Sequence, residues 1–281
     1  MGMLVGGIVT LSTDEIRKFR KAIYKYYNEH GRELPWRRTQ DGYRILVSEI
    51  MLQQTQVDRV LEKYPAFVRR FPNFRALADA SLRDVLAAWQ GLGYNRRAVS
   101  LKKIGEIVTE KHGGRLRADV DFLRGLPGIG YNTACAILAF AFNRPVVFIE
   151  TNIRTVFIHF FFADRNDVRD SEILPLVERT LDRKSSHRFY SALMDYGTML
   201  KRIHGSINPK SVHYQKQSPF KGSDRQVRGM VLKHLLENPN PSQSGMAEKI
   251  GIAAQRLQQV LKNLKAEGFV RERNGLYSIA E

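Results

Sequence analysis

The stretch Leu126-Pro127-Gly128-Ile129-Gly130 decides the fold, because it joins two segments with helical signals. Asp121 is expected to cap a short helix ending near Gly125, and a second helix is expected from about Tyr131 to Phe142. Glycines at alternate loop positions let the backbone approach a ligand closely, and the N-terminus of the next helix favours an anion. Helix-hairpin-helix elements hold a DNA phosphate in this way without reading the base sequence. The stretch therefore predicts a phosphate-binding hairpin between two helices, and a plain tight turn is the alternative.

The charge of the chain favours the same ligand. Its 281 residues include 45 Lys and Arg against 28 Asp and Glu, so the net charge is +17. A surplus of this size attracts polyanions and speeds their capture. A basic chain kept soluble by self-repulsion is the alternative, and the predicted phosphate-binding loop argues against it.

Cysteine content and hydropathy exclude several classes of protein. Cys135 is the one cysteine and lies in an apolar run, so a disulfide framework or a four-thiolate metal site is excluded and a buried core residue is expected. The opening stretch Met1–Thr10 is short and lacks a basic leader, and no apolar run reaches about 20 residues. We expect a cytoplasmic, nucleoid-associated monomer without a membrane segment.

Further helices follow from apolar periodicity and capping residues. Ser12 or Thr13 can cap the first, Ser81 with Asp84 forms a capping-box signature, and Thr151 can cap another. The expected helices span 13–30, 43–54, 82–90, 152–162, 171–181 and 188–202. The predicted organisation is an N-terminal extension over 1–12, a helical domain over 13–202, a basic linker over 203–223 and a last unit over 224–281.

The last unit has the order of a winged helix. Helices are expected over 225–237, 245–250 and 253–267, followed by two β-like runs on either side of Asn274-Gly275, a strong hairpin signal. Such modules bind DNA or mediate protein contacts. The stretch that leads into this unit carries seven basic residues against Asp224: Lys201, Arg202, Lys210, Lys216, Lys221, Arg225 and Arg228. We expect phosphate contacts from Lys216, Lys221 and Arg225.

Two carboxylates occupy positions that suit acid–base chemistry. Glu49 lies in the apolar helix expected over 43–54, where burial would raise its pKa and let it act as a general acid. A position on the wet face of that helix, or in a hidden salt bridge, is the alternative. Glu150 follows the apolar run 145–149 and precedes a helix, where a carboxylate also complements the helix dipole.

Four stretches together resemble the adenine DNA glycosylases that act on A/G-type mismatches. They are Pro35-Trp36-Arg37, Ser48-Glu49-Ile50-Met51-Leu52-Gln53-Gln54-Thr55-Gln56-Val57, Gly91-Leu92-Gly93-Tyr94 and the hairpin 126–130. The resemblance covers about residues 30–202, and the run 48–57 is far more specific than the hairpin. It implies the two-lobed helical fold of the helix-hairpin-helix glycosylase superfamily, here followed by a small winged-helix-like α/β module.

The resemblance also implies residue roles. Glu49 falls on the acid that protonates the adenine ring, Gln54 on the residue that wedges into the base stack, and Tyr94 on a tyrosine of the base pocket. Asn152 matches an asparagine beside the catalytic loop, and Asn132 is assigned to the pocket. DNA contacts are implied for a further set: Arg37, Gln53, Thr55, Leu126, Gly128, Ile129 and Gly130.

The implied chemistry is hydrolysis of a glycosidic bond. Protonation makes the purine a better leaving group, and a second carboxylate stabilises the oxocarbenium-like sugar. The base must first leave the stack, at a cost of about a few kcal/mol that phosphate contacts can offset.

The chain departs from the family pattern at three places. The second carboxylate is Glu150 instead of aspartate, and a displacement of about 1 Å can cost ~100-fold in rate, so either the loop is adapted or the reaction has drifted. Relatives that also cut the DNA backbone have a lysine where this chain has Asn132, so we expect a monofunctional enzyme. The stretch 201–217, where most of the family has a four-cysteine loop, contains no cysteine, so we expect no iron–sulfur cluster.

The C-terminal part departs as well. The resemblance implies a C-terminal domain that reads 8-oxoguanine, and a winged-helix-like unit stands in its place, which leaves recognition of that lesion open. As in relatives, backbone carbonyls of the hairpin loop can hold a structural monovalent or alkaline-earth ion.

The sequence thus predicts a monofunctional DNA glycosylase that acts on double-stranded DNA with a mismatch or lesion. The substrate predicted first is adenine opposite guanine or 8-oxoguanine. Activity on mismatched thymine or uracil, or on hypoxanthine, is an alternative. A non-catalytic damage sensor or transcriptional regulator is another, motivated by Glu150 and the winged-helix unit.

Overall fold

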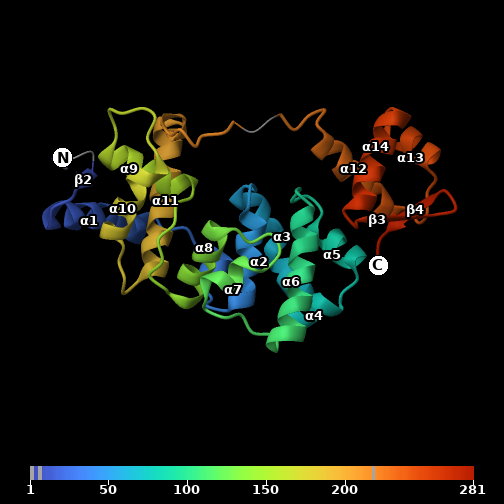
Figure 1. Ribbon diagram of the computed structural model, residues 1–281, viewed down its shortest axis with the longest axis horizontal. Coiled ribbons are helices and arrows are strands. Elements are labelled where there is room, and N and C mark those ends of the chain that lie inside the picture. The colour runs from blue at the N-terminus through green and yellow to red at the C-terminus, as the bar shows by residue number, and fades with distance from the viewer. Residues whose placement is uncertain (1–2, 6–7, 217–218) are drawn as a thin grey trace. The chain divides into compact units, whose positions relative to one another are not determined.

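The computed structural model describes residues 3–5, 8–216 and 219–281, most of them helical (Figure 1). The chain forms two compact units that alternate along the sequence. The first contains Met1–Ile45, Arg117–Gly125 and Ile129–Lys216, and the second contains Leu46–Leu116, Leu126–Gly128 and Gln217–Glu281. No described helix is long and apolar enough to span a membrane.

The first unit combines a small hairpin with helices. Strands β1 (Met3–Val5) and β2 (Ile8–Thr10) pair antiparallel, with Leu4 opposite Val9. The helical elements are α1 (Thr13–His30), η1 (Pro35–Arg37), α7 (Val120–Arg124), α8 (Tyr131–Phe142), α9 (Thr151–Phe161), α10 (Asp170–Thr180), α11 (Ser186–His204) and η2 (Asn208–Lys210).

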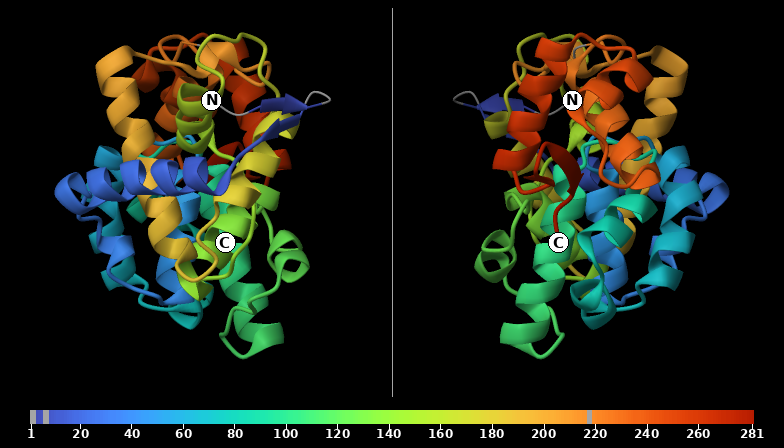
Figure 2. Two further views of the ribbon diagram at one scale, coloured as in Figure 1. Left: turned by 90° about the vertical axis from the view of Figure 1, so that its left-hand side faces the viewer. Right: turned by 90° about the vertical axis from the view of Figure 1, so that its right-hand side faces the viewer.

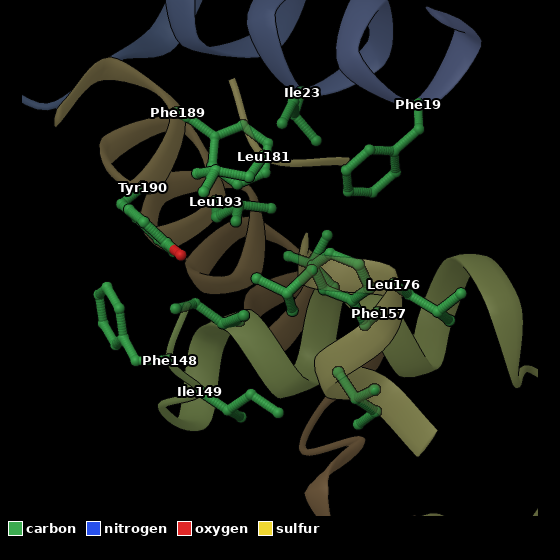
Figure 3. Close-up of a cluster of buried hydrophobic side chains, with 14 of the residues drawn as sticks. Phe19, Ile23, Phe148, Ile149, Phe157, Leu176, Leu181, Phe189, Tyr190 and Leu193 are labelled. Carbon is green, nitrogen blue, oxygen red and sulfur yellow. The ribbon is translucent and has the colours of Figure 1, made fainter. Parts of the chain in front are cut away.

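The core of the first unit lies among α1, α9, α10 and α11. Helix α1 packs against α11, and α11 packs against α9 (Figure 2). Phe19 and Ile23 of α1 point toward Phe157 of α9 and Phe189 of α11, and all four are buried (Figure 3). Cys135 of α8 is a buried free thiol in the same cluster, as expected.

The second unit holds helices from the middle and the end of the chain. They are α2 (Gly42–Leu52), whose first residues belong to the first unit, α3 (Val57–Arg70), α4 (Phe74–Asp79), α5 (Leu82–Trp89), α6 (Arg96–His112), α12 (Asp224–Glu237), α13 (Gln243–Ile250) and α14 (Ala254–Ala266), with strands β3 (Val270–Arg273) and β4 (Leu276–Ile279). Helices α4 and α6 pack closely, and Trp89 of α5 meets Phe67 of α3 with ring centroids 5.9 Å apart.

The last part of the chain folds as a winged helix. Helix α14 buries Leu257, Leu261 and Leu264, and β3 pairs antiparallel with β4. The turn residues Asn274 and Gly275 have φ of 52° and 75°, the left-handed values that a tight hairpin turn requires. The predicted fold class, a helical domain followed by a winged-helix module, is confirmed.

Several local predictions need correction. Helix α7 is capped by Asp119, whose side chain accepts from the Phe122 amide at 2.7 Å, and not by Asp121. Helix α9 is capped by Glu150, and Thr151 is its first helical residue. Helices α3, α4 and α6 and the β1–β2 hairpin were not predicted at all.

Candidate active site

The hairpin between α7 and α8 presents backbone rather than side chains. Leu126 and Ile129 are buried and anchor the loop, whereas Gly128 and Gly130 are exposed. Gly128 has a φ of 76°, and a Cβ there would lie 3.0 Å from the Ser100 hydroxyl, so only glycine fits. An anion can therefore approach the loop amides closely.

The loop is tied to the end of α2. Gln53 donates from Nε2 to the carbonyl oxygen of Gly128 at 3.2 Å. Gln53 was expected to contact DNA. In the structure its bond to Gly128 also fixes the hairpin relative to the segment that carries Gln54.

Arg97, at the start of α6, holds two loops together from the inside. Its side chain is buried, and its Nη1 donates to three carbonyl oxygens at the C-terminal end of α2, those of Ile50, Met51 and Gln53. Its Nη2 donates to the Thr55 hydroxyl at 2.9 Å and to the carbonyls of Leu92 and Gly93 at 3.2 and 3.0 Å. Burial lowers the pKa of Arg97 to about 10, so it is still charged at neutral pH.

Gln54, which lies between two residues that Arg97 contacts, and Tyr94, whose carbonyl accepts from Arg97 Nε at 3.4 Å, have unusual backbone conformations. Gln54 has a φ of 55° and Tyr94 a φ of 47°, both in the left-handed region that non-glycine residues rarely adopt. Such conformations persist where the surroundings over-determine them, and they concentrate at functional sites. The predicted wedge and the predicted pocket tyrosine thus belong to one rigid pair of loops.

Tyr94 lies beside two cations. The guanidinium carbons of Arg97 and Arg225 lie 5.5 and 5.4 Å from the centre of its ring. Arg225 also donates from Nη1 to the Tyr94 hydroxyl. Arg225 was expected to contact phosphate, and in the structure its guanidinium is engaged by the tyrosine.

Glu150 folds back onto the helix that it precedes. Its Oε1 accepts from the amides of Asn152 and Ile153 at 2.8 and 3.0 Å, and its Oε2 accepts from Asn152 Nδ2 at 3.3 Å. Burial raises the pKa of this carboxyl above its ordinary value, although the hydrogen bonds from Ile153 and Asn152 oppose the shift. The longer side chain turns back to reach amides that aspartate, a common N-cap residue, reaches directly.

The start of α9 is held from behind by α11. A Cβ on Gly197 would lie 2.6 Å from the carbonyl oxygen of Asn152 and 2.7 Å from its Cβ, so α11 touches the α9 backbone directly. Glu150 and Asn152 are consequently fixed as one element.

The remaining catalytic candidates are placed individually. Glu49 is half-buried in α2, within the second unit, and Glu150 belongs to the first. Asn132 is exposed on the first turn of α8 and offers no amine there. The pairing of Glu49 and Glu150 across one pocket stays a prediction.

Arg37 is used inside the first unit. It donates to both carboxylate oxygens of Asp195, at 2.7 and 2.9 Å, and its side chain is 10% exposed. Arg32 adds a further ion pair to the same carboxylate at 2.6 Å. Burial alone would raise the pKa of Asp195, but the bonds from Arg37 and Arg32 outweigh it and lower the pKa. Contact between Arg37 and DNA stays a prediction. The Arg37 guanidinium would have to bind DNA while it keeps its bonds to Asp195.

The segment expected as a linker is partly ordered against the first unit. Val168 donates to the Lys210 carbonyl at 2.9 Å, and Asn208 and Ser211 are buried. Lys216 and Lys221 are exposed, as phosphate contacts require.

Sequence reasoning missed Arg97 and Asp195. Asp195 could have been noticed as a carboxylate among apolar residues of a helix. Arg97 gave no signal, because most of its partners are backbone carbonyls.

An ion at the hairpin loop stays a prediction. In the part of the chain that the structure describes, no group of three or more His, Cys, Asp or Glu side chains could hold a metal. Backbone carbonyls are therefore the ligands that an ion there would use, and that of Gly128 already accepts from Gln53.

Comparison with protein families gives two matches. Residues 47–179 match the HhH-GPD superfamily base excision DNA repair protein, and residues 225–271 match a winged helix-turn-helix DNA-binding domain. A solved thermostable thymine-DNA glycosylase has the same fold, with a TM-score of 0.59 and 24% identity over 66% of this chain and 87% of its own. The class defined by fold and hairpin is thus a helix-hairpin-helix base excision repair protein.

Curated relatives narrow the class. The adenine DNA glycosylase of Mycolicibacterium smegmatis is 31% identical over 92% of this chain and 94% of its own length. That of Buchnera aphidicola is 36% identical over 65% of this chain, which spans about half of that relative (52%). A thymine/uracil-DNA glycosylase of Pyrobaculum aerophilum is 38% identical over 48% of this chain and 60% of its own. The chain belongs to the adenine DNA glycosylases, a family of base excision repair enzymes.

Proposed function

We propose that this chain is a monofunctional DNA glycosylase that hydrolyses the N-glycosidic bond of adenine paired with guanine or 8-oxoguanine. The observation that carries the proposal is the rigid loop pair around Arg97, because it fixes Gln54 and Tyr94, the residues assigned to wedge and pocket. The Gln54 loop lies in the stretch 48–57, which most specifically resembles adenine DNA glycosylases, and Tyr94 ends a second stretch of the resemblance, 91–94.

In the proposed reaction Glu49 donates a proton to the everted purine and so weakens the bond to the sugar. Glu150, as a carboxylate, stabilises the positive charge that develops on the sugar. Its cap bonds to α9 hold it in place without further reorganisation. A water molecule adds to C1′ of the sugar in place of the base and loses a proton to solvent, so the products are free adenine and an abasic site. Asn132 cannot form a Schiff base, so the abasic strand is left uncut.

A panel of duplexes with single lesions tests the substrate. We expect adenine to be released from A:G or A:8-oxoguanine pairs, with strand breakage only after alkali. Glu49→Gln should lower the single-turnover rate by about 10²-fold or more while DNA affinity is kept. Glu62→Gln, an exposed glutamate on α3, is the matched control and should keep the rate. Strand cutting without alkali, or full activity of Glu49→Gln, would contradict the proposal.

Thymine or uracil in mismatches is the second candidate. The identity of 38% with a thymine/uracil-DNA glycosylase favours it, although over 48% of the chain. Release of pyrimidines alone from the same panel would replace adenine as the substrate.

The proposal includes a monomer that acts on nucleoid DNA in the cytoplasm. Sedimentation of the protein with and without duplex tests the stoichiometry. A dimer at the concentrations used in the activity assays would contradict the proposed monomer and would leave the proposed reaction unaffected.

A further inference from the structure

We infer that Arg225 of the winged-helix module is a positioning residue for Tyr94, so that the module takes part in recognition of the everted base. The inference rests on the proposed function, in which Tyr94 lines the base pocket. It gives the C-terminal module a role in the reaction beyond attachment to DNA.

The contact itself has two components. Arg225 donates a hydrogen bond to the Tyr94 hydroxyl, and its guanidinium lies 5.4 Å from the ring centre. A phenol that accepts from a cation is polarised and keeps its own O–H as a donor. Such a donor suits the acceptor atoms on the edge of a nucleobase, so Arg225 can tune both the position and the donor strength of Tyr94.

Arg96, two residues after Tyr94, forms an ion pair with the same winged-helix module. Glu267, which follows α14, accepts two bonds from Arg96 at 2.7 and 2.8 Å and two from Arg228 of α12 at 2.9 and 2.6 Å. The bond from Arg96 is the main cause that lowers the pKa of Glu267 to about 2. The bridge therefore persists over the whole range in which the protein would work.

A third contact lies on α5. Arg83 donates to the carbonyl oxygens of Leu235, at 3.3 Å, and Leu236 at the end of α12. Contacts from the end of α12 and from Glu267 thus reach both α5 and the start of α6, the two helices that flank the Tyr94 loop. This arrangement sets the position of Arg225 without any contribution from DNA.

The competing role for Arg225 is a phosphate contact, and the two roles have different signatures. A positioning residue changes the rate of base release at saturating DNA. A phosphate contact changes affinity and lowers the slope of log affinity against log salt by about one, with no change in the saturated rate.

The test compares Arg225→Ala with Lys233→Ala, which removes the same charge from an exposed position on the same helix. Single-turnover rates are measured on the duplex from which the wild type releases a base, together with affinity at several salt concentrations and thermal unfolding. We expect Arg225→Ala to lower the saturated rate about tenfold and Lys233→Ala to leave it unchanged.

A double-mutant cycle makes the test specific to the pair. In a Tyr94→Phe background, which removes the acceptor, Arg225→Ala should cost less than about twofold more. Arg225→Lys keeps a cationic donor and should recover part of the rate, and it replaces the alanine variant if that variant does not fold.

The inference is overturned if Arg225→Ala lowers the affinity and the slope of log affinity against log salt but leaves the saturated rate unchanged. It is also overturned if the rate losses of Arg225→Ala and Tyr94→Phe are additive in the double variant. Failure of the proposed function is a separate result. In that case the wild type itself releases no base from any duplex of the panel.

Discussion

At the scale of single residues, Glu150 shows how a long acidic side chain can act as the N-cap of a helix. Its side chain turns back and accepts two amide bonds at the start of α9, as a shorter N-cap residue would. The helix N-terminus favours the charged form, whereas burial favours the neutral form, and burial dominates. The consequence is a carboxyl group whose charge depends on pH in a higher range than usual.

This predicts an acid limb in the pH profile of base release. A raised pKa means that Glu150 becomes protonated sooner as the pH falls, so the rate should halve at a pH above its ordinary 4.5. Glu150→Gln should lower the rate about 100-fold or more and remove that limb. The profile is measured by single-turnover kinetics with DNA saturating at each pH.

Glu172→Gln is the control, because Glu172 caps α10 by bonding to the Arg169 amide and its pKa is lowered by that bond. The acid limb should be unchanged in this variant. If the acid limb survives in Glu150→Gln, it belongs to another group.

The raised pKa of Glu150 also affects folding stability through linkage. The folded state holds the proton more tightly than the unfolded state, so we expect the free energy of unfolding to fall as the pH rises through this pKa.

The sequence predicted the residue types of the candidate site better than their contacts. Gln54 and Tyr94 were named from resemblance, and their strained backbones follow from a buried arginine that no pattern indicated. Arg37 was assigned to DNA from the resemblance and Arg225 to phosphate from its charge, and neither signal reveals the partner that each side chain has within the protein. Those partners, Asp195 and Tyr94, are more than 100 positions away in sequence.

At the scale of elements, the contact between α9 and α11 limits what position 197 can hold. Gly197→Ala would place a methyl group 2.6 Å from the Asn152 carbonyl, so the start of α9 must move. We expect a loss of about 1–3 kcal/mol in the free energy of unfolding. A shift of Glu150 by about 1 Å would lower the rate ~100-fold. Denaturant unfolding and single-turnover kinetics measure the two effects.

Gly229→Ala is the matched control, because Gly229 is also helical and a methyl there would meet no described atom within 4 Å. It should be neutral or stabilise by up to about 1 kcal/mol. Equal behaviour of the two variants would show that the close approach at Gly197 is unimportant.

Strongly marked elements were predictable and weakly marked ones were not. The helix Tyr131–Phe142 and the Asn274-Gly275 turn were found where expected. Helix α3 contains Pro65, which resembles a breaker, and α6 starts without a side-chain cap. The cap of α9 was misplaced because glutamate is an uncommon N-cap, and only the folded backbone shows that it reaches the amides.

At the scale of the whole molecule, the surplus of positive charge should govern binding. With a net charge of +17 we expect affinity for duplex DNA to fall about 10³-fold or more between about 50 and 200 mM salt. Replacing Lys216 and Lys221 together by alanine should lower the slope of log affinity against log salt by about two. Fluorescence anisotropy over a salt series measures both, and a flat salt dependence would contradict the assignment.

The alternation of the two units along the sequence has a consequence for synthesis. When the first 116 residues have left the ribosome, the first unit has received one of its three segments, and the second unit still lacks the winged helix. Both units are therefore complete only after segments from later in the chain have been translated. Apolar surface that packs against those later segments stays exposed to solvent for longer during synthesis, which favours aggregation of the nascent chain.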